Sequence, residues 1–304
     1  MKKSVLVTGG AGLLAINWAL TVRDEYDVTL LLHQRKISLK GVQTAVESID
    51  SLAHCKAVLD KYQPDIVVHS AGLANVEECE KNPRLAKEIN VNLAKNIAIS
   101  CNEKSIKLIH ISTDHLFSGN LGFVTEEGEP EPLNMYAKTK LQGEQEVKKN
   151  CKDALVIRTN FFAWGTTYRQ SFSDFIINKL RNSEEVYLFS DVFFTTILVS
   201  ELCKHVHNLA GENLNGVYNV VGGDRLSKYE FGIKIATCFG LDVGLIKNIS
   251  IGAKKGLVLR PKDMSLSNNK MCTDLGCIIP GIDIQLKELK IQERNSATNQ
   301  VLNL

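Results

Sequence analysis

Residues 4–15 read SVLVTGGAGLLA, a run of apolar residues followed by three closely spaced glycines and then by helix-forming residues. The apolar run at 4–8 predicts a buried strand, and the residues at 13–24 predict the helix that follows it. Gly9 permits a tight turn, and Gly12 permits close approach of the backbone to a bound group. A glycine turn in this position is typical of a dinucleotide site, where N–H groups at the helix start bind a pyrophosphate.

Further strands and helices alternate along the first half of the chain. Nearly continuous apolar runs predict strands at 28–32, 65–69, 108–112 and 154–158. Helical patterns are predicted between them at 51–62, 83–104 and 136–150. This alternation predicts an α/β fold with a doubly wound parallel sheet of the Rossmann type, followed by a smaller α/β C-terminal substrate domain.

The second half is more irregular, with elements predicted at 186–189, 199–209, 217–221 and 227–239. We expect residues 1–160 to form a dinucleotide-binding Rossmann domain. Residues 161–304 should form mainly a substrate-binding domain, with segments around 191–225 returning to the first. From residue 293 onward the chain has no apolar periodicity, so we expect this tail to fray.

Composition narrows the class of protein. A net charge of +2 in 304 residues gives no reason to expect a nucleic acid or an acidic membrane as partner. The eight cysteines form no CxxC pair and no zinc-ligand spacing, which indicates reduced thiols and no metal site. No apolar run approaches the roughly 20 residues that span a bilayer. We therefore expect a cytoplasmic protein, and the sequence leaves both a monomer and a homodimer open.

The end of the second predicted strand bears on the choice of dinucleotide. A carboxylate there would bind the ribose hydroxyls of NAD. The chain instead reads LHQRK at 32–36, in which Arg35 and Lys36 can pair with a 2′-phosphate and His33 lies alongside. We expect NADPH as cofactor, with NADH as the alternative, and a solvated basic loop as the purely structural interpretation.

A second motif points to chemistry on a carbonyl group. Tyr136 and Lys140 are four residues apart, so they share one face of the predicted helix. A phenol exchanges protons near neutral pH only when a nearby positive charge favours its charged form. The fourth strand ends in HISTD at 110–114, and strand carboxyl ends face the ligand crevice of such a sheet. Thr113 can bind a carbonyl oxygen there while Tyr136 donates a proton.

The order of these motifs resembles the extended short-chain dehydrogenase/reductase family, in its dTDP-4-dehydrorhamnose reductase branch. PDIVVHSAG at 64–72 and INV at 89–91 are similar to the third strand and following helix of that branch. STDHLFSG at 112–119 resembles its STDYVFDG, and EPEPLNMY at 129–136 resembles the lead-in to its catalytic tyrosine. GVYNVV at 216–221, SKYEF at 227–231 and RP at 260–261 resemble landmarks of its substrate domain.

The resemblance implies reduction of a 4-keto group on a nucleotide-activated 6-deoxy sugar, for surface polysaccharide or deoxysugar biosynthesis. Thr113, Tyr136 and Lys140 would be the catalytic residues, with Tyr136 as the acid. The cofactor-binding residues would be Gly9, Gly12, Leu13, Leu14, His33, Arg35, Ala71, Gly72, Asn90, Ser112, Tyr136 and Lys140. Expected substrate contacts are Asp114, His115, Trp164 and Arg260, of which Trp164 and Arg260 are equally compatible with structural roles.

Departures from the branch keep other functions open. Residues 190–196 read SDVFFTT where relatives have a DQxGxPT-like stretch, so the sugar is not identified. An epimerase or dehydratase of the same superfamily is one alternative, although dehydratases of this type carry an acidic residue where this chain has His115. A regulatory subunit without turnover, resembling the β subunit of methionine adenosyltransferase, is another. The presence of Thr113, Tyr136 and Lys140 argues against it.

Overall fold

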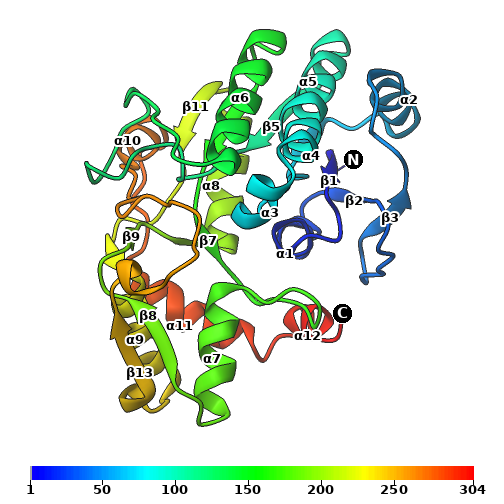
Figure 1. Cartoon of the computed structure of the whole chain (residues 1–304). Coiled ribbons are helices and arrows are strands. Elements are labelled where there is room, and N and C mark those ends of the chain that lie inside the picture. Colours follow the sequence, from blue (N-terminus) through cyan, green and yellow to red (C-terminus); the bar gives the residue numbers. More distant parts are fainter. Residues whose placement is uncertain (1) are drawn as a thin grey trace.

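A seven-stranded sheet forms the centre of the computed structural model, which describes residues 2–304 (Figure 1). Its strands lie in the order β11 (Gly216–Asn219), β6 (Leu155–Arg158), β5 (Lys107–Ile111), β4 (Ile66–His69), β1 (Ser4–Thr8), β2 (Asp27–Leu32) and β3 (Gln43–Val46). Each neighbouring pair in this order is parallel. The predicted doubly wound parallel sheet is therefore confirmed.

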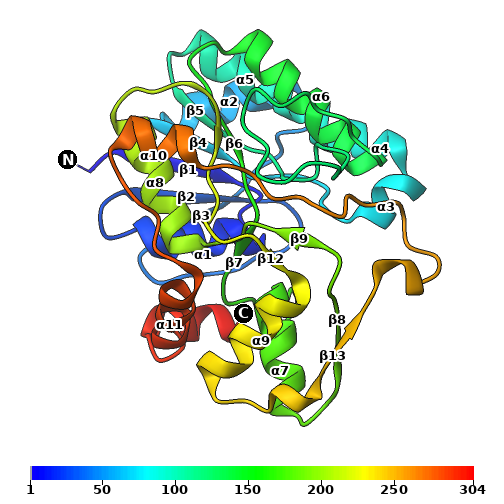
Figure 2. The ribbon, with the colours of Figure 1, turned by 90° about the vertical axis from the view of Figure 1, so that its left-hand side faces the viewer.

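Helices cover both faces of this sheet. The helices α1 (Leu13–Val22) and α8 (Val199–Gly211) pack on one face, and α2 (Leu52–Tyr62), α5 (Leu93–Glu103) and α6 (Met135–Asn150) pack on the other (Figures 1 and 2). Within β1, Val5 and Val7 belong to the hydrophobic cluster of the first face and Leu6 to that of the second. Because both faces are buried, the strands are apolar at every position rather than at alternate ones.

A separate hydrophobic cluster lies below the sheet in the view of Figure 1. The elements in this part of the chain include α7 (Phe172–Arg181), β8 (Val186–Phe189), α9 (Lys228–Phe239), β13 (Ile246–Ile249) and α11 (Ile282–Gln292). Phe231 packs edge-on against Phe162 and Phe194, with ring centroids 5.4 and 5.5 Å apart. The shorter elements of this half are β7 (Phe161–Phe162), β9 (Phe193–Phe194), β10 (Ile197–Leu198), β12 (Leu226–Ser227), α10 (Asn269–Leu275) and the 3-10 turns Val243–Leu245 and Ile251–Ala253.

The single helix expected at 83–104 is interrupted. It follows the short helix α3 (Val76–Lys81) and divides into α4 (Pro83–Lys87), a π-helical turn over Glu88–Asn92, and α5. The π-helical turn coincides with a close crossing by α6, where any Cβ added to Gly143 would overlap the carbonyl oxygen of Asn90. Glycine at this position therefore lets α6 lie directly against the turn.

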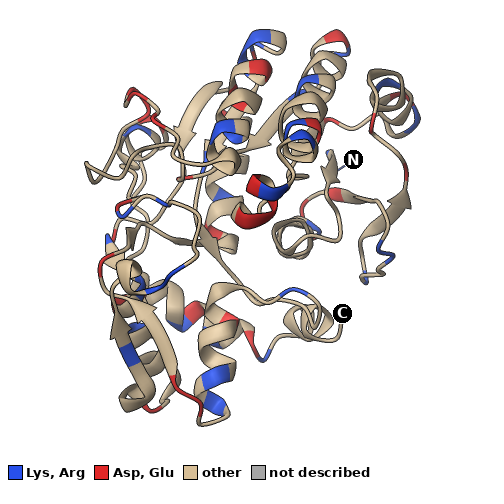
Figure 3. Cartoon of the chain, in the orientation of Figure 1, with Lys and Arg blue, Asp and Glu red and all other residues tan. Residues whose placement is uncertain are grey.

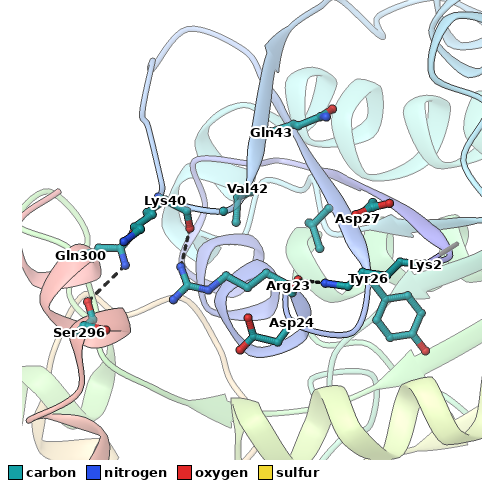
Figure 4. A pocket seen from close by; sticks show the side chains of 12 residues that line it. Lys2, Arg23, Asp24, Tyr26, Asp27, Lys40, Val42, Gln43, Ser296 and Gln300 are labelled. Carbon is teal, nitrogen blue, oxygen red and sulfur yellow. Dashed lines mark hydrogen bonds between the residues drawn. The ribbon is translucent and has the colours of Figure 1, made fainter.

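The expectation that the chain frays from residue 293 onward is wrong. Residues Ser296–Leu302 form α12, which packs against α1 and buries Val301 in the first hydrophobic cluster. Gln300 Oε1 accepts a hydrogen bond from the backbone N–H of Lys40 at 2.8 Å, and Arg23 donates to the carbonyl oxygen of Lys40 at 2.6 Å (Figure 4). A helix of this length makes too few turns for an apolar repeat to be visible in its sequence.

Charged residues of both signs are interspersed over the helices and loops (Figure 3). The eight cysteines are free thiols. Within residues 2–304, no helix combines the length and the apolar character needed to cross a membrane.

Candidate functional site

A cavity of about 620 Å³ lies around the glycine turn, at the carboxyl ends of β1, β2, β4 and β5. All of the residues expected to bind a dinucleotide line it, except Asn90. Its cationic side chains are Arg35, Lys140 and Arg169, and no Asp or Glu is among its lining residues. The cavity is therefore suited to a ligand that carries several negative charges.

The glycine turn leaves room for backbone atoms only. Gly9 has a φ of +70°, and a Cβ there would lie 2.9 Å from Ala71 Cα. Gly12 is the N-cap residue of α1 and offers no side-chain acceptor to the first turn of the helix. The N–H groups of that turn thus stay available to an anion, and the helix dipole favours one. These observations fit the pyrophosphate of a dinucleotide.

Asn90 does not reach this cavity, which corrects its expected role as a direct cofactor contact. The side chain is 2% exposed, and its Oδ1 accepts a hydrogen bond from Leu73 N at 2.8 Å. Its Nδ2 donates to Leu73 O at 3.1 Å and to Thr139 Oγ1 at 3.0 Å. Because the amide is occupied by these bonds, Asn90 supports the loop that lines the cavity and ties it to α6.

The helix α6 carries the Tyr and Lys of the second motif into the cavity. It begins after Asn134, whose side chain accepts a hydrogen bond from Ala137 N at 2.9 Å. Lys140 Nζ donates to the carbonyl oxygen of Ile111 at 2.7 Å, which fixes the amine at the end of β5. Burial lowers the pKa of Lys140 to about 8, and the nearby carboxylate of Glu144 opposes this shift. Lys140 is therefore still mainly charged at neutral pH.

Tyr136 and Thr113 meet at the same point. Burial raises the pKa of the Tyr136 phenol, and a hydrogen bond with Thr113 acts in the opposite direction. The phenol is thus protonated at neutral pH and able to donate. Thr113 Oγ1 also donates to Asp114 Oδ1 at 3.3 Å, and Asp114 Oδ2 accepts from Asn160 Nδ2 at 2.7 Å. Asp114, expected to touch the substrate, instead uses both carboxylate oxygens within the protein and orients Thr113.

His115 lies beside Tyr136 and near Arg260, and neither His115 nor Arg260 lines the dinucleotide cavity. The ring of His115 meets that of Tyr136 edge-on, with centroids 5.6 Å apart. Arg260 forms an ion pair with Glu77, and its Nε is buried without a hydrogen-bond partner among the described residues. His115 thus lies beside Tyr136, with Arg260 near it and partly neutralised by Glu77, and their expected contact with the substrate stays a prediction.

Lys228, at the first position of α9, is a functional candidate that the sequence did not single out. Its Nζ lies 3.3 Å from the centroid of the Phe194 ring. Its pKa is lowered to about 8, mainly by burial. The Asp114 carboxylate opposes this shift, and the positive charge of Arg260 adds to it. The SKYEF stretch at 227–231 resembles a landmark of the substrate domain, but nothing in it indicates that the lysine lies near Asp114.

Trp164 is a core residue, and its assignment as a substrate contact is wrong. The side chain is 3% exposed, its Nε1 donates to Leu289 O at 2.9 Å, and its ring packs edge-on against Phe239.

Tyr168 and Arg169 line the cavity although the sequence does not predict them as site residues. No sequence signal marks them, because they lie in an irregular segment that reaches the glycine turn only through tertiary folding. Within residues 2–304, no group of three or more His, Cys, Asp or Glu side chains is placed to hold a metal ion.

Comparison with known proteins adds to this geometry. The family described as RmlD substrate binding domain matches residues 1–293. The chain is 28% identical over 289 residues to the probable low-salt glycan biosynthesis reductase of Haloferax volcanii, covering 93% of this chain and 96% of that protein. It is 27% identical over 293 residues to methionine adenosyltransferase 2 subunit beta of Mus musculus, covering 89% and 82%. The crystal structure of dTDP-4-dehydrorhamnose reductase from Bacillus anthracis in complex with NADP has a TM-score of 0.85 and 25% identity, covering 96% of this chain and 100% of that one.

Proposed function

The chain belongs to the RmlD substrate binding domain family. We propose that it uses NADPH to reduce the 4-keto group of a nucleotide-activated 6-deoxy sugar. One observation carries the proposal. Tyr136 and Lys140 line the same cavity as the glycine turn, and the Thr113 hydroxyl lies close enough to the Tyr136 phenol to lower its pKa. A dinucleotide site and a proton donor are thereby brought together at one edge of the sheet.

The side chains divide the chemistry between them. NADPH, when bound, supplies the hydride that reduces the carbonyl carbon. Tyr136 Oη donates the proton to the carbonyl oxygen, and Thr113 Oγ1 orients that oxygen. The charge on Lys140 stabilises the phenolate left on Tyr136 after the proton has been donated. The Gly9 turn and the start of α1 bind the pyrophosphate.

We further propose that the part of the chain formed mainly by residues 161–304 binds the nucleotide of the substrate. His115 packs against Tyr136 and lies near Lys228 and Arg260, and none of the three lines the dinucleotide cavity. Lys228 and Arg260 carry positive charge that suits the diphosphate linking a nucleotide to its sugar, whereas burial lowers the pKa of His115 and keeps its ring neutral. The relative from Haloferax volcanii, a probable glycan biosynthesis reductase, supports a place in glycan synthesis.

The test follows the absorbance of NADPH with a panel of dTDP- and UDP-linked 4-keto sugars, using the unmodified chain and Tyr136→Phe. Tyr136→Phe removes the proton donor but keeps the ring, so kcat should fall by about 10²- to 10⁴-fold while the Kd of NADPH barely changes. Full turnover by Tyr136→Phe would show that another group is the acid.

A second candidate function is a regulatory subunit without turnover. It is favoured by the similarity to methionine adenosyltransferase 2 subunit beta, which extends over 89% of this chain. Absence of NADPH oxidation across the whole panel, together with tight binding to a second enzyme, would select this candidate over the reductase.

A further inference from the structure

A loop from the second half of the chain closes one side of the dinucleotide cavity. Residues 165–171 lie in the connection between β7 and α7, and Tyr168 and Arg169 within this loop line the cavity. The Tyr168 hydroxyl donates a hydrogen bond to the carbonyl oxygen of Ala11 at 3.0 Å. The loop is thus attached directly to the glycine turn, at a residue that borders the pyrophosphate site.

The backbone around Tyr168 is held in place by its own hydrogen bonds. Thr166 N donates to Arg169 O at 3.0 Å, and Arg169 N donates to Thr166 O at 3.2 Å and to Thr166 Oγ1 at 3.0 Å. Thr166 itself is buried. At the end of the loop, Ser171 and Asp174 form a capping box at the start of α7. Tyr168 therefore extends from a fixed turn rather than from a free loop.

The ring of Tyr168 carries the guanidinium of Arg35. Arg35 Cζ lies 3.9 Å from the centroid of this ring. Arg35 is exposed, and it forms no ion pair within residues 2–304. A guanidinium stacked in this way directs its N–H groups outward in the plane of the group and leaves its second face open. That arrangement matches bidentate recognition of a phosphate, with an adenine ring able to stack on the open face.

The remaining lining residues favour an extra anion in this place. A carboxylate at the end of β2 would accept hydrogen bonds from the ribose hydroxyls of NAD. This cavity contains no carboxylate, whereas Arg35 and Arg169 both line the region of Tyr168. The charge and the stacking geometry thus point to the same ligand group.

We propose that Tyr168 is a positioning residue for cofactor choice: by holding Arg35 against its ring, it presents the guanidinium to a phosphate on the adenosine ribose, so that the site prefers NADP(H) to NAD(H). This inference rests on the proposed dinucleotide-dependent function. It adds that the second half of the chain, through the 165–171 loop, determines which dinucleotide the first half accepts.

The experiment compares the Kd of NADP⁺ and of NAD⁺ by calorimetry for the full chain and four variants. Tyr168→Leu removes the stacking surface, so NADP⁺ should bind about two- to fivefold more weakly, as the loss of one exposed cation–π contact predicts. NAD⁺ affinity should hardly change beyond the effect of losing the bond to Ala11. Tyr168→Phe keeps the ring and loses only the Ala11 bond, so it should shift both affinities equally and preserve their ratio. Arg35→Lys keeps the charge but removes the planar group that stacks on the ring. It should therefore lower the ratio of NADP⁺ affinity to NAD⁺ affinity, as Tyr168→Leu does.

Each outcome separates this inference from the proposed function. If the unmodified chain binds neither dinucleotide, both fail. If it binds both dinucleotides without preference, or if Tyr168→Leu leaves the NADP⁺ to NAD⁺ ratio unchanged, the role of Tyr168 is refuted while the dinucleotide site stands. An equal loss of the ratio in Tyr168→Phe would also refute it, because the ring would then not be the cause. The combined Tyr168→Leu and Arg35→Lys variant should lower the preference for NADP⁺ over NAD⁺ no further than the more damaging single variant, because both substitutions remove the same stacked pair. Additive losses of preference would refute the coupling of the two residues.

Discussion

Glu144→Leu should destabilise the protein strongly, because it leaves a buried charge without a partner. Glu144 and Arg158 are 1% and 4% exposed, and Arg158 Nη2 and Nε donate to the carboxylate at 2.9 and 3.1 Å. Breaking a buried pair of this kind costs about 3–5 kcal/mol in free energy of unfolding. Arg158 would keep its hydrogen bond to the carbonyl oxygen of Glu126 at 3.3 Å and its position 5.5 Å from the centroid of the Phe117 ring, which together cannot balance a full charge.

Urea unfolding followed by circular dichroism measures this cost. The matched control is the double variant Glu144→Leu with Arg158→Met, in which neither charge remains. It should recover most of the loss, since replacing both members of a buried pair by apolar groups is often nearly neutral. A cost below about 1 kcal/mol for Glu144→Leu, or a double variant as unstable as the sum of the two single ones, would refute the reasoning.

The milder change Glu144→Gln tests the same pair through catalysis. The Glu144 carboxylate raises the pKa of Lys140 against the effect of burial, which leaves that pKa at about 8. Removing the charge should lower the pKa further. Because the charged amine is the active form, activity is lost as pH rises through this pKa, and the alkaline limb of kcat/KM should move to lower pH. An alkaline limb that does not move would show that Lys140 is not the group titrating there.

Two further predictions concern Lys228 and the buried histidines. Lys228→Met should raise the KM for the nucleotide sugar and leave the Kd of NADPH unchanged, because Lys228 lies near Asp114 and Arg260 and does not line the dinucleotide cavity. Steady-state kinetics and an NADPH binding titration measure the two effects. Weakened NADPH binding with an unchanged KM would contradict the prediction. Burial lowers the pKa of His69 to about 3 and that of His207 to about 4, so the folded state binds fewer protons than the unfolded state below about pH 6.5. The free energy of unfolding should therefore fall as pH drops from about 6.5 toward about 4, and urea midpoints that rose over this range would contradict the prediction.

The predicted site residues that the structure brings together are those whose relative positions follow from local geometry. The glycine turn lies between a strand and a helix that are adjacent in the chain, so its position at the carboxyl end of β1 follows from residues 4–15 alone. Tyr136 and Lys140 share a face because they are four apart on one helix. Thr113 follows β5, and the carboxyl ends of parallel strands meet at one edge of the sheet.

The parts that sequence could not predict depend on which distant residues pack together. A tryptophan after β6 is equally compatible with a pocket and a core, and only the position of α11 places Trp164 inside. Asn90 has the residue type of a ligand contact, but the close crossing of α6 directs its amide into the protein. Tyr168 reaches the glycine turn across more than 150 residues of sequence, at a separation where no local pattern carries information.

The docking of α12 has a consequence for how the polypeptide is made. Val5 and Val301 belong to the same hydrophobic cluster, one in the first strand and the other in the last helix. During synthesis the part of α1 against which α12 packs therefore stays uncovered until residue 301 has left the ribosome. Contacts of such long sequence separation form slowly and leave partly folded chains prone to association. We therefore expect the nascent chain to depend on chaperones more than the compact final fold suggests.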